Sequence, residues 1–177
     1  MPISVAPRRW LVLALAVAGC ASGASVRSDA LSASVRGELD GAALALLAET
    51  VRAVEGHDWD AYVGLLDASA YDEAVAFLVD GGADRQVAVS ETLEGALSLG
   101  FVSTRVFPAG ADRARSPHAG LDWIRTLTFD AVTDRRPAYD RLTVAGRVTL
   151  DDGTSLPVSV TVLRPSGPDP VLAVPQG

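Results

Sequence analysis

The chain has 177 residues and a formal net charge of −7, from 15 basic and 22 acidic residues. A hydrophobic share of 49% is too high for an intrinsically disordered chain. Every basic residue is Arg, and an acidic balance without basic clusters argues against nucleic acid as a partner. A single Cys excludes a disulfide framework and any zinc site built on Cys.

The N-terminus has the layout of a secretory signal peptide. Arg8 and Arg9 supply a positive start, and the nine residues from Trp10 to Ala18 are all apolar. A membrane-spanning helix needs about 20 apolar residues, so this run is too short to cross a bilayer. We therefore expect residues 1–19 to be a lipoprotein signal peptide.

The residues Val17-Ala18-Gly19-Cys20 resemble the bacterial lipobox. The resemblance implies cleavage before Cys20 and lipidation of that Cys, so the expected partner is the membrane. Cleavage leaves 13 basic and 22 acidic residues, a charge of −9 that anionic lipid repels, so the acyl chains would hold the protein. The alternative is an ordinary signal peptide that happens to contain a Cys.

The residue after the lipobox bears on which membrane is used. Ala21 stands where an Asp is the usual inner-membrane retention signal of Gram-negative lipoproteins. Its presence favours a bacterial cell-envelope location at the outer membrane, facing the periplasm, if the source is Gram-negative.

The remaining chain divides into a linker and one domain. Residues 20–39 comprise Cys20 and a stretch rich in Ser, Ala and Gly, which predicts a flexible tether. Residues 40–177 are long enough for a single domain with a hydrophobic core.

The first half of this domain has helical periodicity. Asp40 is a plausible N-cap for a helix that ends at Gly56, with apolar residues at three- and four-residue spacing. A short helix follows His57-Asp58-Trp59-Asp60, a third is capped by Ser69, and a fourth covers residues 85–98.

The second half has the alternation of β-strands. In the long strand, Leu121, Trp123, Leu127 and Phe129 are expected to share the apolar face. A polar loop is expected at residues 108–120. The predicted strands cover residues 101–107, 121–132, 142–150, 156–162 and 171–174.

The turn Asp151-Asp152-Gly153 fixes the register of one hairpin. A two-residue loop would turn the apolar residues of one strand outward. A three-residue loop pairs Val148 with Leu156 and Val144 with Val160, with Gly153 in the left-handed conformation. The expected fold class is therefore α+β, with N-terminal helices packed on one face of a curved antiparallel β-meander.

The segment from Gly56 to Tyr62, with Leu65-Leu66 and the order of helices then meander, resembles the nuclear transport factor 2-like superfamily. The resemblance covers residues 40–174 and implies a cone whose helices and bent sheet enclose a pocket. Enzymes of that superfamily, such as ketosteroid isomerase and polyketide cyclases, use a buried Asp or His, often with a Tyr.

Five residues are candidates for the pocket. Trp59, Tyr62, Trp123 and Phe129 would line it with aromatic surface, or they would simply be core residues. Arg125 interrupts the apolar face and would bind an anion, or it would place its head in water at the mouth of the sheet.

No residue is assigned a catalytic role, and no cofactor or metal is expected. The inward positions of the predicted strands hold no Asp, Glu or His, although Asp60, Tyr62, Tyr71 or Asp72 on the helices could supply an acid or base.

The two His residues and one Arg pair have bland interpretations. His57 fits a turn between helices, and His118 fits an exposed loop. Two distant His without a third partner make a zinc site improbable. The pair Arg135-Arg136 fits a solvated hairpin tip.

Three functions remain open. The first is a non-catalytic envelope lipoprotein that binds a small apolar ligand or an envelope protein partner. The second is a pocket enzyme of isomerase or cyclase type. The third is a structural or assembly lipoprotein whose cavity is filled by side chains. The state of the cavity separates these alternatives.

Overall fold

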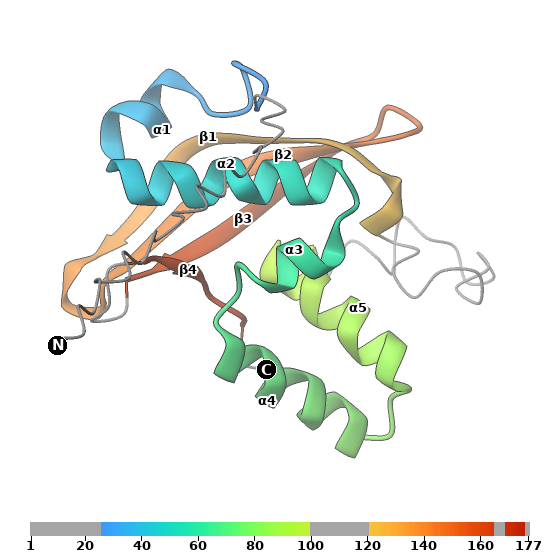
Figure 1. Cartoon of the computed structure of the whole chain (residues 1–177). Helices are drawn as coiled ribbons and strands as arrows, with labels where there is room; N and C mark the ends of the chain where they lie inside the picture. Colours follow the sequence, from blue (N-terminus) through green and yellow to red (C-terminus); the bar gives the residue numbers. More distant parts are fainter. Residues whose placement is uncertain (1–25, 100–120, 165–168, 176–177) are drawn as a thin grey trace, which may run out of the picture.

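The computed structural model describes residues 26–99, 121–164 and 169–175. The expected strand at 101–107, the loop at 108–120 with His118, and Cys20 with its signal peptide lie outside the described residues. Five helices precede the sheet in this part of the chain (Figure 1). They are α1 (Ala33–Glu38), α2 (Gly41–Glu55), α3 (Trp59–Val63), α4 (Ala68–Asp80) and α5 (Arg85–Ala96).

The sheet is an antiparallel meander in the order β1-β2-β3-β4. Helix α2 lies along it, while α4 and α5 form a hairpin beyond its edge (Figure 1). The α+β class and the curved antiparallel sheet are thereby confirmed. The strands are β1 (Ile124–Arg136), β2 (Arg141–Leu150), β3 (Ser155–Leu163) and β4 (Val171–Leu172), with 3-10 turns η1 (Leu121–Trp123) and η2 (Pro137–Tyr139).

Aspartates begin four of the helices. Asp40, Asp58, Asp67 and Asp84 each accept a hydrogen bond from a backbone N–H of the first helical turn. This satisfies donors that have no partner inside the helix. The cap of α2 at Asp40 is confirmed, whereas Ser69 does not cap α4, because Asp67 does so two residues earlier.

The β2–β3 hairpin has the predicted register. Val148 pairs with Leu156 and Val144 pairs with Val160. The N–H of Gly153 donates to the carbonyl of Leu150, and Gly153 has a φ of +85°. The three-residue loop with a left-handed Gly is confirmed.

Strand β1 is bulged, and the bulge overturns part of the predicted face. Ile124 pairs with Leu150 and Thr126 with Thr149, so Arg125 is an extra residue between them. An extra residue reverses which side chains point inward. Ile124 is therefore fully buried, while Trp123 and Arg125 lie at the surface.

The predicted boundary between tether and domain is wrong, because the folded unit starts before residue 40. Ala30 and Val35 are fully buried, and Leu31 lies beside Phe129 in a parallel bridge. The N–H of Phe129 donates to the carbonyl of Ala30 at 2.7 Å, and the N–H of Ser32 donates to the carbonyl of Phe129 at 2.9 Å. A segment rich in Ser and Ala resembles a linker in composition, but here it supplies core and sheet contacts.

Side chains close the rest of the outer edge of β1. The N–H of Leu127 donates to Glu55 Oε1 at 2.9 Å, and Arg27 pairs with the same carboxylate oxygen at 3.0 Å. Nearer the start of the strand, His57 Nε2 lies 2.8 Å from the carbonyl oxygen of Ile124. Because a carbonyl oxygen only accepts, Nε2 carries the proton and donates.

The core lies between α2 and the face of the sheet formed by the even-numbered residues of β2 and β3. Gly146 lies on this face opposite Phe129. A Cβ at Gly146 would stand 1.9 Å from the carbonyl oxygen of Thr128, so a larger residue cannot fit without moving β1.

Truncation tests the corrected boundary. A chain that begins at Asp40 loses the buried residues Leu31, Val35 and Leu39. Each such side chain contributes about 1.5–3 kcal/mol when buried, partly offset by the ordering of the segment. We expect the free energy of unfolding, measured in urea, to fall by about 3 kcal/mol or more relative to a chain that begins at Ala21. Equal stability of the two chains would show that residues 21–39 are a tether after all.

A pair of Gly substitutions tests the close approach of β1 and β2. Gly146→Ala should lower the free energy of unfolding by about 2 kcal/mol, in the range of overpacked cores. Gly95→Ala is the matched control: no atom lies within 4 Å of its Cβ position in α5, so it should raise stability by roughly 0.5–1 kcal/mol. Thermal and urea unfolding measure both, and an unchanged stability of Gly146→Ala would contradict the packing described.

Candidate functional site

The turn between α2 and α3 gathers three of the residues singled out in the sequence. The ring of His57 stacks on Trp59 with centroids 5.8 Å apart and planes inclined by 15°. Trp59 meets Tyr62 edge-on at 6.4 Å, and its indole Nε1 donates to Asp122 Oδ1 at 2.8 Å. With its own bond to the carbonyl of Ile124, His57 holds the helix turn against β1. These contacts give His57 a structural role in the turn.

Tyr62 and Phe129 are sealed in the core. Both are fully buried, and Trp59 is only 8% exposed. The Tyr62 hydroxyl has no hydrogen-bond partner among the described residues, and burial raises the pKa of this hydroxyl above its ordinary value. A neutral hydroxyl enclosed by apolar side chains is unsuited to proton transfer with a substrate.

Trp123 and Arg125 do not join the other candidates. Trp123 is 41% exposed, and Arg125 is exposed at the bulge. The five candidate residues are therefore split between the core and the surface. Among the described residues they do not line a common apolar pocket.

The helix-borne acids fall into two groups. Asp60 and Asp72 are exposed to water. Glu94 in α5, which sequence reasoning missed, is only 5% exposed and accepts from the Ser90 hydroxyl at 3.4 Å. The available signal was the position of Glu94 between Leu93 and Leu97, with Ser90 one helical turn before it. Glu94 does not line the groove described next.

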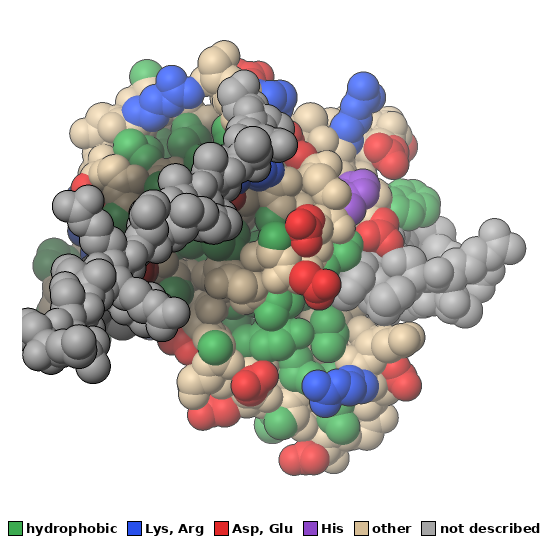
Figure 2. Space-filling view, in the orientation of Figure 1, with side chains coloured by type: hydrophobic (Ala, Val, Ile, Leu, Met, Phe, Trp, Pro, Cys, Tyr) green, Lys and Arg blue, Asp and Glu red, His purple; other side chains and the backbone are tan. Residues whose placement is uncertain are grey.

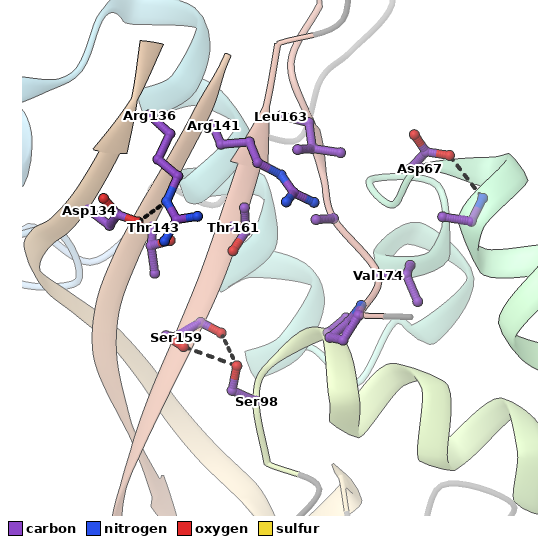
Figure 3. A pocket seen from close by; sticks show the side chains of 14 residues that line it. Asp67, Ser98, Asp134, Arg136, Arg141, Thr143, Ser159, Thr161, Leu163 and Val174 are labelled. Atoms are coloured by element: carbon purple, nitrogen blue, oxygen red, sulfur yellow. Dashed lines mark hydrogen bonds and ion pairs between the residues drawn. The ribbon is translucent and has the colours of Figure 1, made fainter. Parts of the chain in front are cut away.

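A groove of about 700 Å³ lies on the opposite face of the sheet from the core (Figure 3). Outward-facing residues of β1, β2 and β3 form its floor. The start of α4, the end of α5 and residues 173–175 form the wall that rises beside this floor. The lining residues are Asp67, Ala70, Ala96, Ser98, Asp134, Arg136, Arg141, Thr143, Ser159, Thr161, Leu163, Ala173, Val174 and Pro175.

Two cross-strand rows order the floor of the groove. In the first row Arg136 pairs with Arg141, which pairs with Leu163. In the second row Asp134 pairs with Thr143, which pairs with Thr161. Guanidinium groups, hydroxyls and a carboxylate thus face one hollow, which has the chemistry to hold a polar ligand by ion pairs and hydrogen bonds.

The far wall is held against the sheet at Ser98 and Ser159. The Ser98 hydroxyl lies 3.0 Å from both the carbonyl oxygen and the hydroxyl of Ser159. The N–H of Ser159 donates to the carbonyl of Leu97 at 3.3 Å. These bonds set the width of the groove at one end (Figure 3).

Sequence reasoning did not find this groove. Arg141, Thr143, Ser159 and Thr161 alternate with core residues, which is also the pattern of an ordinary solvated face. The pair Arg135-Arg136 is exposed, as predicted, and also makes ion pairs: Arg135 with Glu38 at 3.2 Å and Arg136 with Asp134 at 2.7 Å. Only the fold shows that α4 and residues 173–175 rise beside these positions.

A second surface feature is apolar. Phe77 is 70% exposed and Val79 is 37% exposed, both on α4. Figure 2 shows hydrophobic side chains gathered at the surface over the α4–α5 hairpin. Only Val75 of α4 is buried, so this helix presents most of its surface outward.

The described residues contain neither a cluster of metal ligands nor a helix that could span a membrane. Among residues 26–99, 121–164 and 169–175, no three His, Cys, Asp or Glu side chains come together to hold a metal ion. In the same ranges, no helix combines the length and the apolar character that a bilayer crossing requires.

No protein-family model matches the chain, and neither a curated protein nor a solved structure matches it. Arguments about function therefore rest on the residues themselves.

A hydroxyl deletion tests the role of Tyr62. Tyr62→Phe removes a buried donor that has no partner in the described part of the chain, so stability should stay the same or rise by about 1 kcal/mol. Phe129→Ala, the reference for a large core deletion, should lose about 3–5 kcal/mol. Thermal unfolding compares the two variants. A Tyr62→Phe variant less stable than the parent by more than about 1 kcal/mol would mean that the hydroxyl has a partner.

Proposed function

We propose that this chain is a lipid-anchored, non-catalytic binding protein of the bacterial cell envelope, held through Cys20. The observation that carries the binding role is the groove between the outward face of the sheet and the start of α4. It is lined by two Arg, two Asp and four hydroxyl residues. Among the described residues the lining has no His and no Cys, and the Asp134 carboxylate is engaged by Arg136.

The chemistry of the groove favours a polar ligand or a protein partner over a small apolar ligand. The aromatic residues once expected to line an apolar pocket are core residues or surface residues. The pocket-enzyme alternative has weaker support, because Asp60 and Asp72 are exposed and the Tyr62 hydroxyl is enclosed.

An assembly role is the second candidate. The exposed Phe77 on α4 supports a domain that acts through its surface. In that case the α4–α5 hairpin, and not the groove, would contact the partner.

The order of three or more helices followed by an antiparallel meander supports the proposed kinship with the nuclear transport factor 2-like superfamily. The lipobox supports lipidation at Cys20, and Ala21 supports the outer membrane, facing the periplasm, if the source is Gram-negative.

The length of the tether follows from the lipobox and the corrected boundary. Nine residues lie between Cys20 and the buried Ala30, so ten residue steps join the two. A fully extended chain spans about 3.3–3.6 Å per residue, so the domain would stay within roughly 35 Å of the membrane surface. Its partners would therefore be components of that membrane or of the layer next to it.

Cys20→Ser tests the anchor. In a bacterial host, the parent chain should partition into the detergent phase, and mass spectrometry should find an N-terminal peptide that begins at an acylated Cys20. Cys20→Ser should lose the acyl mass and keep residues 1–19, because cleavage follows lipidation. Ala21→Ser is the control and should be processed normally. An unmodified thiol on the parent chain would refute the anchor.

Native mass spectrometry of the full chain, released from its own host in detergent, tests the binding role. A retained polar molecule or a co-purified envelope protein would support it. A chain that turns over a co-purified small molecule would instead support an enzyme.

A further inference from the structure

Four arginines gather at one end of the sheet, and three of them have carboxylate partners. Arg135 pairs with Glu38, Arg136 with Asp134, and Arg164 with Asp40 at 2.5 Å. Arg141 is the fourth, and it has no carboxylate partner among the described residues. Its guanidinium is also a lining group of the groove.

The position of Arg141 breaks a local rule of sheet design. It lies directly opposite Arg136 in the β1–β2 ladder. Like charges that face each other across a ladder are destabilising. Among the described residues, Asp134 offsets the charge of Arg136 but does not pair with Arg141. Departures from such rules are expected where a site serves a ligand. A bound anion beside Arg141 would relieve the repulsion.

The opposite wall offers a negative charge. Asp67 lines the groove from the first turn of α4. Its Oδ1 accepts from the N–H of Ala70 at 3.0 Å, which leaves the other carboxylate oxygen for a ligand. Figure 3 shows Asp67 across the groove from Arg136 and Arg141, on the side of α4.

The charges of the lining residues that the structure describes are balanced but separated in space. Two Arg and two Asp line the groove, and Arg136 and Asp134 neutralise each other. Arg141 on the floor of the groove and Asp67 on its helical wall remain as the two charges that are not neutralised in this way. A ligand that fits this pattern carries a carboxylate at one end and an ammonium group at the other.

The size and lining of the groove suit a short peptide. Thr143 and Thr161 form a cross-strand pair whose hydroxyls have no other partner among the described residues, so they are free to bond peptide groups. Ala70, Ala96 and Val174 leave room for small side chains. A volume of about 700 Å³ is within the usual range of about 300–1,000 Å³ for small-ligand sites.

We propose that the groove binds a short peptide with free termini, its carboxylate on Arg141 and its ammonium group on Asp67. This inference rests on the proposed binding function and names the ligand class for it.

Trialanine is the probe, titrated into the full chain in a non-ionic detergent and followed by calorimetry or by NMR shifts. Arg141→Gln should weaken binding about fivefold, the magnitude of one partly exposed ion pair. Amidation of the peptide's C-terminus should weaken binding to the parent by a similar factor. In Arg141→Gln, the amidated and the free peptide should bind with the same affinity.

Asp67→Asn tests the other end. Asn caps helices as well as Asp, so α4 should keep its stability while the charge is lost. This variant should bind trialanine about fivefold more weakly than the parent does. It should bind N-acetylated trialanine with the same affinity as the parent. Arg125→Gln is the control, since it removes an exposed charge outside the groove. It should bind like the parent.

Three results would overturn the inference: no binding of trialanine, equal affinity for the amidated peptide, or full affinity in Arg141→Gln. None of these bears on the anchor, which the Cys20 experiment tests. A different molecule found by native mass spectrometry, lost in Arg141→Gln, would retain the binding function and reject the peptide.

Discussion

An exposed strand edge presents unpaired N–H and C=O groups, and the fold depends on how the edge of β1 is closed. Residues 30–32 form two backbone hydrogen bonds with Phe129. Glu55 accepts from Leu127, and His57 donates to Ile124. All three contributions come from outside the sheet. The N-terminal segment and the end of α2 therefore hold β1 in place at the edge of the sheet.

The local patterns predicted the regular parts of this fold. The alternation of inward and outward residues selected the three-residue hairpin loop at Gly153, because one register alone kept Val144 and Val160 on the same face. The same reasoning gave the wrong face at Arg125, because one extra residue in a bulge reverses the alternation and nothing in the composition marks the bulge. The boundary at Asp40 failed because Leu31 and Val35 are stabilised by distant partners, which local composition does not reveal.

The candidate site was hidden for a related reason. Alternating polar residues such as Thr143 and Thr161 predict a face turned away from the core, and that is where they lie. Whether such a face is open water or the floor of a groove depends on elements far along the chain. Here Asp67 and Val174 rise beside it. The aromatic candidates were conspicuous in the sequence, but Tyr62 and Phe129 stabilise the core instead.

The entry of residues 26–32 along β1 has a mechanical consequence. If Cys20 is fixed in a membrane, any drag on the domain is transmitted through this segment. The load falls first on the ion pairs of Arg27 with Asp29 and Glu55, and then on the bonds between Ala30, Ser32 and Phe129. Leu31 runs parallel to β1, so a pull along the strand direction shears these bonds together rather than opening them one at a time. The attachment point is thus reinforced against tension by the same contacts that seal the sheet.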